Sequence, residues 1–204
     1  MKYLILSVAL AAFIPISVSA IHGQAVNPAL RQELLDMETV DQDARFKCIK
    51  ETAEKQIDCL RIISETIDQK NTNRLREIYK THGFPTERLV GHDGFQAFML
   101  LLQHSMKDDL RIAVQRSVRN AFIHKELPPQ DYANFIDRLR LHQGKPQLYG
   151  QGFSFKDGKL VMDPIIDPKN IDKRRRKIGL PPIEEEVRML KEIYKVDVEM
   201  PPVH

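Results

Sequence analysis

Apolar residues at helical spacing run through most of this 204-residue chain and limit the folds open to it. Between positions 28 and 143 they recur every three or four residues, which is the spacing of one helix face. Asn27-Pro28 starts the first segment, Gly83 ends the second and Gly144 ends the last. The predicted helices cover residues 28–48, 57–82, 95–106, 109–126 and 130–143.

The pattern changes after Gly144. Residues 153–162 are predicted to form a β-hairpin that turns at Asp157-Gly158, a residue pair typical of tight hairpins. Two further helical segments follow, and the chain ends in a stretch without periodicity. These elements are predicted over residues 167–178 and 182–196, with a loose tail over residues 197–204.

The first twenty residues have the composition of an export signal. Lys2 precedes an apolar run over residues 3–16, and small residues follow it, as at a signal-peptidase site. The run is too short to cross a bilayer, and no later stretch approaches the roughly 20 apolar residues that a membrane helix needs. We therefore predict a signal peptide over residues 1–20 and a periplasmic or secreted protein.

The remaining length fits one domain with a substantial core. We predict a mainly α, single-domain helical bundle over residues 21–196, with one small β-hairpin near residues 153–162. The chain carries 31 Lys and Arg against 28 Asp and Glu. This balance argues against a nucleic-acid partner, which would require a strongly basic surface.

Cys48 and Cys59 are the only cysteines, and an even count in an oxidising compartment favours a disulfide. In one continuous helix their Cα atoms would lie about 16 Å apart, whereas a disulfide needs less than about 7 Å. A bridge therefore requires a turn between them, as in a helical hairpin, although residues 49–58 contain neither Gly nor Pro. Two unbridged, partly buried thiols are the alternative.

An acidic residue interrupts the apolar stripe of the first predicted helix. Asp41 lies between Met37 and Ala44, with Arg45 one helical turn further on. An isolated buried carboxylate is costly, so Asp41 must be paired or line a cavity. An Asp41–Arg45 ion pair at the edge of the stripe is the simpler interpretation. In the second predicted helix, the polar residue Asn71 interrupts the inward apolar stripe.

Gln103 and His104 follow an apolar run, residues 97–102, that predicts a central helix. Asp108 lies four residues after His104 and shares its face if the helix continues. A carboxylate can orient an imidazole for proton transfer, or both can ligate a metal. Two ligands do not complete a zinc site, so no metal site is predicted. A hydrogen-bonded core histidine is the structural alternative.

Asp137 and Arg138 are neighbours on a predicted helix and point about 100° apart, so one of them is expected to face the interior. An inward guanidinium would bind a carboxylate or phosphate through two parallel hydrogen bonds. An internal salt bridge, for example to Asp41, is the alternative. Gln147 and Tyr149 lie in the following loop, a common place for binding residues.

The order of these short motifs resembles that of a widespread bacterial domain family of unknown function. The family pattern reads Asp-Gln…Arg, Asp-x-x-Asn…Leu-Lys-x-Ile, Gly-Trp-Pro-Thr, Gln-His-Ala-Asp, Asp-Arg and Gln-x-Tyr-Gly-Thr-Gln, with a closing Asp-Pro…Arg…Gly-Leu-Pro-Pro. The matching residues are Asp41-Gln42, Arg45, Asp68, Asn71, Leu75-Arg76-Glu77-Ile78, Gly83-Phe84-Pro85-Thr86, Gln103-His104, Asp137-Arg138, Gln147-Leu148-Tyr149-Gly150, Asp167-Pro168, Arg175 and Gly179-Leu180-Pro181-Pro182.

Two departures from that pattern concern the polar residues. The acid two residues after the histidine is Met106 here, which leaves Asp108 as the nearby carboxylate, and the family's Thr-Gln becomes Gln151-Gly152. The resemblance strengthens the hypothesis of a polar site but implies no reaction and no substrate.

We therefore predict a polar cleft that binds or acts on a small polar or anionic ligand. If it is catalytic, His104 is the acid/base, Asp108 or Asp41 orients it, and Arg138 holds the anion. The alternative is a non-catalytic envelope interaction protein in which the same residues form a buried structural network. The candidate catalytic residues are His104, Asp108, Asp137 and Arg138, and the candidate ligand-binding residues are Asp41, Arg45, Asn71, Gln103, Gln147 and Tyr149.

Overall fold

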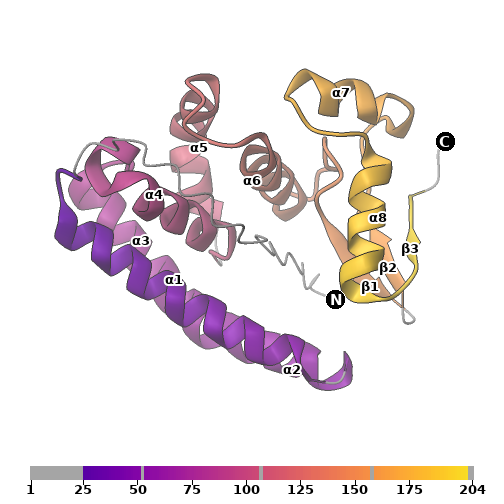
Figure 1. The fold of residues 1–204 in the computed structure, drawn as a ribbon, viewed down its shortest axis with the longest axis horizontal. Coiled ribbons are helices and arrows are strands. Elements are labelled where there is room, and N and C mark those ends of the chain that lie inside the picture. Colours follow the sequence, from indigo (N-terminus) through magenta and orange to yellow (C-terminus); the bar gives the residue numbers. More distant parts are fainter. Residues whose placement is uncertain (1–24, 52, 106–107, 157–158, 202–204) are drawn as a thin grey trace. The chain divides into compact units, whose positions relative to one another are not determined.

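The computed structural model describes residues 25–51, 53–105, 108–156 and 159–201 (Figure 1). The predicted signal peptide lies outside these residues. The chain divides into two compact units, an amino-terminal unit that ends at Ser117 and a carboxy-terminal unit that begins at Val118. Helices make up most of the described residues, so the prediction of a mainly α fold is confirmed.

The amino-terminal unit begins with the long helix α1, Pro28–Ile49. The side chain of Asn27 accepts a hydrogen bond of 3.0 Å from the backbone N–H of Leu30, which caps the helix as predicted. Helix α1 then turns back into helix α2, Ala53–Ile63. The second predicted helix thus starts earlier than its apolar pattern indicated.

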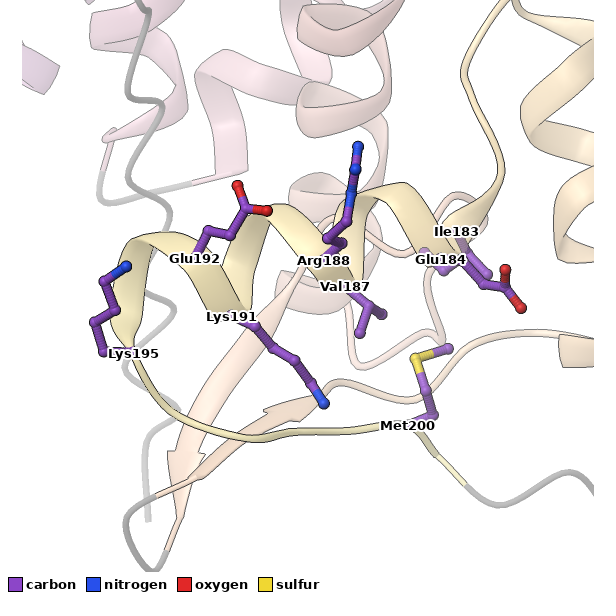
Figure 2. Close-up of a pocket in the computed structure, with 8 residues that line it drawn as sticks. All are labelled: Ile183, Glu184, Val187, Arg188, Lys191, Glu192, Lys195 and Met200. Atoms are coloured by element: carbon purple, nitrogen blue, oxygen red, sulfur yellow. The ribbon is translucent and has the colours of Figure 1, made fainter.

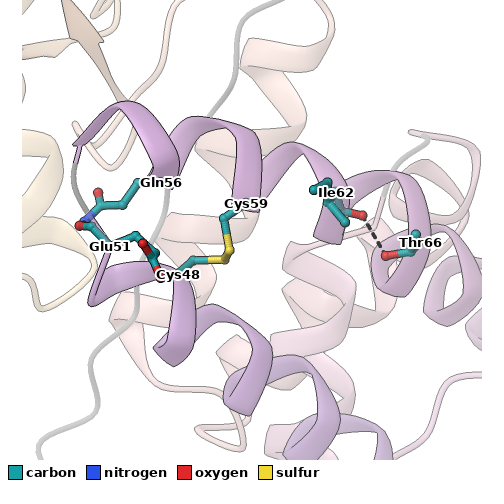
Figure 3. Close-up of a disulfide and its surroundings, with 6 residues drawn as sticks. All are labelled: Cys48, Glu51, Gln56, Cys59, Ile62 and Thr66. Atoms are coloured by element: carbon teal, nitrogen blue, oxygen red, sulfur yellow. Dashed lines mark hydrogen bonds between the residues drawn. A yellow bond between two sulfur atoms is a disulfide. The ribbon is translucent and has the colours of Figure 1, made fainter.

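Cys48 and Cys59 join α1 to α2 through a disulfide (Figure 3). Their Cα atoms are 5.6 Å apart. The backbone N–H groups of Lys50 and Glu51 bind carbonyl groups of the last turn of α1, so the helix closes there and the chain can reverse. The predicted bridge across a helical hairpin is confirmed.

Helix α2 continues without a break into a π-helix, η1, Ser64–Asp68, and then into α3, Gln69–His82. Gly83 ends α3 with φ of 72°, a value that glycine adopts without strain. The amphipathic pattern predicted one regular helix here. The π-turn, which is one residue wider than an α-turn, was not predicted.

Helix α4, Glu87–Gln103, is the most deeply buried helix of the amino-terminal unit and packs against α1. Phe95 and Phe98 are at most 1% exposed, and Phe84 contacts both rings edge to face. The prediction that this helix starts at residue 95 was wrong. The backbone of Gly91 is not helical, with φ of 75° and ψ of 168°, so a kink separates a short first helical segment from the longer segment that contains Phe95.

Helix α5, Asp108–Ile123, contains the boundary between the two units. In the carboxy-terminal unit it is followed by α6, Pro129–His142. Strands β1, Phe153–Lys156, and β2, Lys159–Met162, form the predicted antiparallel hairpin, in which Phe153 pairs with Met162. The predicted turn residues, 157–158, lie outside the described part of the chain.

The chain ends with a short helical segment and a strand. The elements are the 3₁₀-helix η2, Pro168–Asn170, helices α7, Ile171–Lys177, and α8, Ile183–Tyr194, and strand β3, Val198–Glu199. Strand β3 lies within the predicted tail and pairs in parallel with β2, so the sheet order is β1-β2-β3. Within the described residues, no helix combines the length and apolar character needed to cross a membrane.

Candidate functional site

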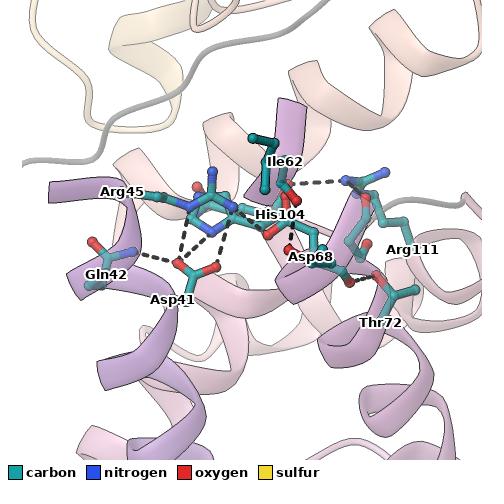
Figure 4. Close-up of polar contacts among 11 residues, drawn as sticks. Asp41, Gln42, Arg45, Ile62, Asp68, Thr72, His104 and Arg111 are labelled. Carbon is teal, nitrogen blue, oxygen red and sulfur yellow. Dashed lines mark hydrogen bonds and ion pairs between the residues drawn. The ribbon is translucent and has the colours of Figure 1, made fainter. Parts of the chain in front are cut away.

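Four ionisable side chains meet inside the amino-terminal unit (Figure 4). Asp41 and Arg45 lie one turn apart on α1, Asp68 ends η1, and His104 follows the last residue of α4. Asp41 is completely buried, Asp68 is 5% exposed and His104 is 8% exposed. We call these four residues the acid–histidine cluster.

Asp41 is at the centre of the cluster. Its Oδ2 atom lies 3.0 Å from Nδ1 of His104 and accepts hydrogen bonds from Nε of Arg45 at 3.2 Å and from the Gln42 amide at 2.8 Å. Nη2 of Arg45 also donates to Oδ1 of Asp68 at 2.5 Å. One guanidinium therefore bridges two buried carboxylates, and the predicted Asp41–Arg45 ion pair is present.

The irregular helix around η1 positions Asp68. The carbonyl group of Asp68 accepts a hydrogen bond of 2.6 Å from the hydroxyl of Thr72, and the carbonyl of Ile62 accepts one of 2.6 Å from the hydroxyl of Thr66. These hydroxyl groups provide donors to the backbone on both sides of the π-turn. Backbone carbonyl groups in and beside the widened turn thus have side-chain hydrogen-bond donors, while the carboxylate of Asp68 contacts Arg45 of α1.

The two carboxylates respond differently to burial. Burial works to raise the pKa of Asp41, but the hydrogen bond and charge of His104, together with Arg45, hold that pKa below its usual range. In Asp68, burial outweighs the effect of Arg45 and raises the pKa to about 6. The same burial therefore leaves Asp41 as the more strongly ionised of the two carboxylates, and Asp68 as the one that keeps its proton more readily.

Three members of the cluster have the donor atoms of a metal site. One ligand atom each from Asp41, Asp68 and His104 lie within 4.8 Å of one another. Carboxylate oxygens and imidazole nitrogens are common ligands of divalent transition metals.

Two of the predicted ligand-binding residues lie beside cluster members in the sequence. Asn71 follows Asp68 by one helical turn and is 7% exposed, and Gln103 precedes His104 and is 2% exposed. Nδ2 of Asn71 and Oε1 of Gln103 have no hydrogen-bond partner among the described residues. Asn71 also lines a groove of about 400 Å³ together with Met37 and Val40 of α1.

Asp108, predicted as a partner of His104, begins α5, but its side chain lies outside the described part of the structure. Asp41, the other predicted partner, contacts the imidazole instead. Asp68 was not among the candidate site residues. The Asp-x-x-Asn spacing of Asp68 and Asn71 was the signal that could have identified it.

The candidate residues after position 130 belong to the carboxy-terminal unit, where Asp137 binds the backbone. It is completely buried and accepts hydrogen bonds from the backbone N–H groups of Leu148 at 2.6 Å, Tyr149 at 2.9 Å and Gln151 at 3.2 Å. Burial raises the pKa of Asp137 to about 6, against the opposing effect of these three donors. The carboxylate therefore fastens the loop after α6 to that helix.

Gln147 and Arg175 complete this arrangement. Gln147 exchanges hydrogen bonds with both backbone groups of Gly152 and donates to the carbonyl of Asp163 at 2.8 Å. Arg175 is completely buried and donates to the carbonyls of Tyr149 and Pro181 at 2.6 and 2.7 Å. We call Asp137, Gln147 and Arg175, with the backbone they hold, the loop network.

The residues predicted for one cleft therefore form two groups, each within one unit. The amino-terminal group contains Asp41, Arg45 and His104, with Asn71 and Gln103 next to cluster members in the sequence. The carboxy-terminal group contains Asp137, Gln147 and Tyr149, together with Arg138, which is 8% exposed.

A separate pocket of about 660 Å³ lies along α8 (Figure 2). Ile183, Val187 and Met200 contribute apolar side chains to it, and charged side chains of α8 and Lys195 surround them. It contains none of the predicted site residues, so it gives no support to the predicted cleft.

Comparisons with known proteins place the chain in a family without assigning it an activity. No curated protein and no solved structure matches it. A family model described as "Family of unknown function (DUF6624)" matches residues 28–199, which include both the acid–histidine cluster and the loop network. The chain therefore belongs to this family of unknown function.

Proposed function

We propose that the acid–histidine cluster is the functional centre of this protein and binds a small polar ligand. The observation that carries the proposal is the mutual contact of two carboxylates, an imidazole and a guanidinium inside an apolar unit. Apolar side chains of similar size would generally fill such a position at a lower free-energy cost. Groups of this kind are concentrated at functional sites.

The π-helix supports the same proposal independently. Single π-turns within α-helices are rare, and they occur frequently at functional sites. Here the π-turn ends at Asp68, which contacts Arg45 in the cluster. Asp41 in turn lies 3.0 Å from Nδ1 of His104, where a carboxylate can orient an imidazole for proton transfer.

The charge of the cluster bears on the class of ligand. Arg45 already contacts both carboxylates, so it has little capacity left for an anion. A neutral polar or positively charged ligand is therefore favoured over an anionic one.

For the loop network we infer a structural role, which corresponds to the alternative of a buried polar network. Asp137, Gln147 and Arg175 direct nearly all their hydrogen bonds to the backbone of one loop and its surroundings. Such bonds specify a loop conformation and need no ligand.

We also infer that the protein is exported. Residues 1–20 support this through their charge and apolar run, and a disulfide is compatible with an oxidising compartment. Fractionation of the native host, with the amino terminus of the purified protein sequenced, tests the inference. A protein that begins at Ile21 outside the cytoplasm is the expected result, and a cytoplasmic protein that retains Met1 would contradict it.

A thermal-shift screen tests the proposed function. A panel of small polar compounds and metal salts is applied to the wild type and to His104→Gln, whose fold is checked by circular dichroism. We expect at least one compound to raise the Tm of the wild type alone. His92→Gln is the matched control, because His92 is an exposed histidine of the same unit that contacts Glu87. If every stabilising compound acts equally on all three proteins, the cluster is not a binding centre.

A further inference from the structure

We infer that the ligand of the acid–histidine cluster is a divalent transition-metal ion bound by Asp41, Asp68 and His104. This inference rests on the proposed function of the same cluster and names the ligand class. It is independent of the loop network.

The spacing of the ligand atoms is the first argument. The three atoms lie within 4.8 Å of one another. Two atoms that each bind a metal at about 2.1 Å are at most about 4.2 Å apart. Neighbouring ligands in tetrahedral or octahedral coordination lie closer, about 3.0–3.4 Å apart, so side-chain rotations that shorten the widest separation by roughly 1–2 Å would bring all three to one ion.

Charge provides the second argument. Arg45 contacts both Asp41 and Asp68, and its side chain is 14% exposed, whereas the side chains of the two carboxylates are 0% and 7% exposed. Arg45 is long and reaches solvent, so it can withdraw along α1. A divalent ion would then supply two positive charges to the carboxylates in place of one.

Two buried amides provide the third argument. Asn71 and Gln103 are more than nine-tenths buried, and each has a side-chain atom without a hydrogen-bond partner in the described part of the chain. Leaving such an atom unpaired in the interior costs about 1–3 kcal/mol. Asn71 shares a helix face with Asp68, and it lines a groove with Met37, which precedes Asp41 by one turn of α1.

These amides are suited to bind water molecules of a metal ion. An amide oxygen accepts from metal-bound water, and an amide nitrogen donates to a ligating carboxylate. For Asn71, which is one helical turn from Asp68, such water or the Asp68 carboxylate is within the reach expected of residues on one helix face.

The donor set indicates the class of metal. Both cysteines form the disulfide, so only oxygen and nitrogen ligands are available in the cluster. Two carboxylates and one imidazole suit Mn²⁺, Fe²⁺ or Zn²⁺ and leave coordination positions for water or a further ligand.

Calorimetry on the full mature protein tests the inference. The protein is treated with a chelator, dialysed, and titrated separately with Zn²⁺ and Mn²⁺. We expect one site per chain, with roughly 100-fold weaker binding in Asp68→Asn and in His104→Gln. His92→Gln should bind as the wild type does. Arg45→Gln should bind more tightly, because it lacks the competing cation.

Pulsed electron paramagnetic resonance of Mn²⁺ added to the wild type gives a second readout that does not depend on variant folding. Coupling of the metal to one imidazole nitrogen is expected. Absence of metal binding, or equal binding by the wild type, Asp68→Asn and His104→Gln, would overturn the inference.

The two proposals fail in distinguishable ways. If a metal-free compound stabilises the wild type but not His104→Gln, and no metal binds, the cluster is a binding centre for another ligand. If neither a metal nor any compound discriminates these proteins, the proposed function fails as well.

Discussion

Asp41 and Asp137 are both completely buried, yet their surroundings differ in kind. Asp137 is bound by three backbone N–H groups of one loop, whereas Asp41 is bound by the side chains of His104, Arg45 and Gln42. Backbone donors are fixed in position and keep their protons. Side-chain partners can rotate away or change protonation, so of these two sites only the cluster around Asp41 can exchange one partner for another.

This contrast shows why burial of a charged residue does not by itself identify a functional site. Asp137 was predicted as a candidate catalytic residue because it and Arg138 are neighbours on a helix, so that one of the two was expected to face the interior. Its partners instead make it part of the loop conformation. The type of partner separates the two regions better than the depth of burial.

The largest expected effect is that of Asp137→Asn. The amide would turn an N–H donor toward backbone N–H groups that now meet a carboxylate oxygen, and at least one of them would stay unsatisfied. We expect a loss of about 3 kcal/mol in the free energy of unfolding, measured in urea at pH 7.5. A loss below about 1 kcal/mol would show that the loop does not depend on this carboxylate.

Removal of the disulfide should affect the amino-terminal unit alone. The double variant Cys48→Ala/Cys59→Ala should lose about 2–3 kcal/mol, since the bridge restrains the unfolded chain. Hydrogen exchange should become faster in α1 and α2 but not in residues 148–151. Faster exchange in that loop as well would indicate that the two units unfold together.

Gly150→Ala tests whether the loop held by the loop network must keep its close packing for the protein to be stable. Gly150 has φ of 76°, and a Cβ atom there would lie 2.7 Å from Cδ1 of Ile183. We expect a loss of about 1–2 kcal/mol from strain and displacement of that side chain. Gly144→Ala is a useful control, because Gly144 has φ of 69° but open space around it. Equal losses in both variants would assign the effect to backbone strain alone.

Of these substitutions, Asp68→Asn should have the smallest effect on stability. The amide keeps the shape of the side chain and removes one of two neighbouring buried negative charges. We expect a change within about 1 kcal/mol, with a gain as readily as a loss. A loss as large as that of Asp137→Asn, measured in the same urea titration, would make the acid–histidine cluster structural too.

The pH dependence of stability adds a small but directional test. The pKa of Asp137 is raised from 3.8 to about 6, so the folded protein binds this proton more tightly than the unfolded chain does. Its contribution to the free energy of unfolding is therefore fully present below about pH 4 and is lost as the pH rises through 6. Carboxyl ¹³C NMR of the native protein measures the pKa. A value below 3 would mean that the backbone donors outweigh burial.

Local signals in the sequence predicted the helix boundaries at Asn27 and Gly83, because a cap depends on a few adjacent residues. The start of α4 was misplaced, since a short helical segment precedes the kink at Gly91 and the longer segment follows it. The pairing of β3 with β2 depends on residues nearly 40 positions apart and has no local signal.

The candidate site was predicted in part. Asp41 was recognised because it interrupts an apolar stripe, with Arg45 one turn further on. His104 was recognised because it follows an apolar run and precedes Asp108 by four residues. Asp68 was overlooked because the π-turn rotates it relative to the regular pattern of its helix. No periodicity argument could assign Asp137 and His104 to separate units.

The π-turn also has a consequence for how this family can vary. The disulfide fixes the rotation of α2 against α1, while the packing of α3 against α4 fixes the rotation of the second half of the same continuous helix. The extra residue in η1 allows α2 and α3 to have different rotations about the axis of the continuous helix. Loss of one residue from positions 64–68 would turn α3 by about 100°, so the length of this segment should be as constrained as any side chain.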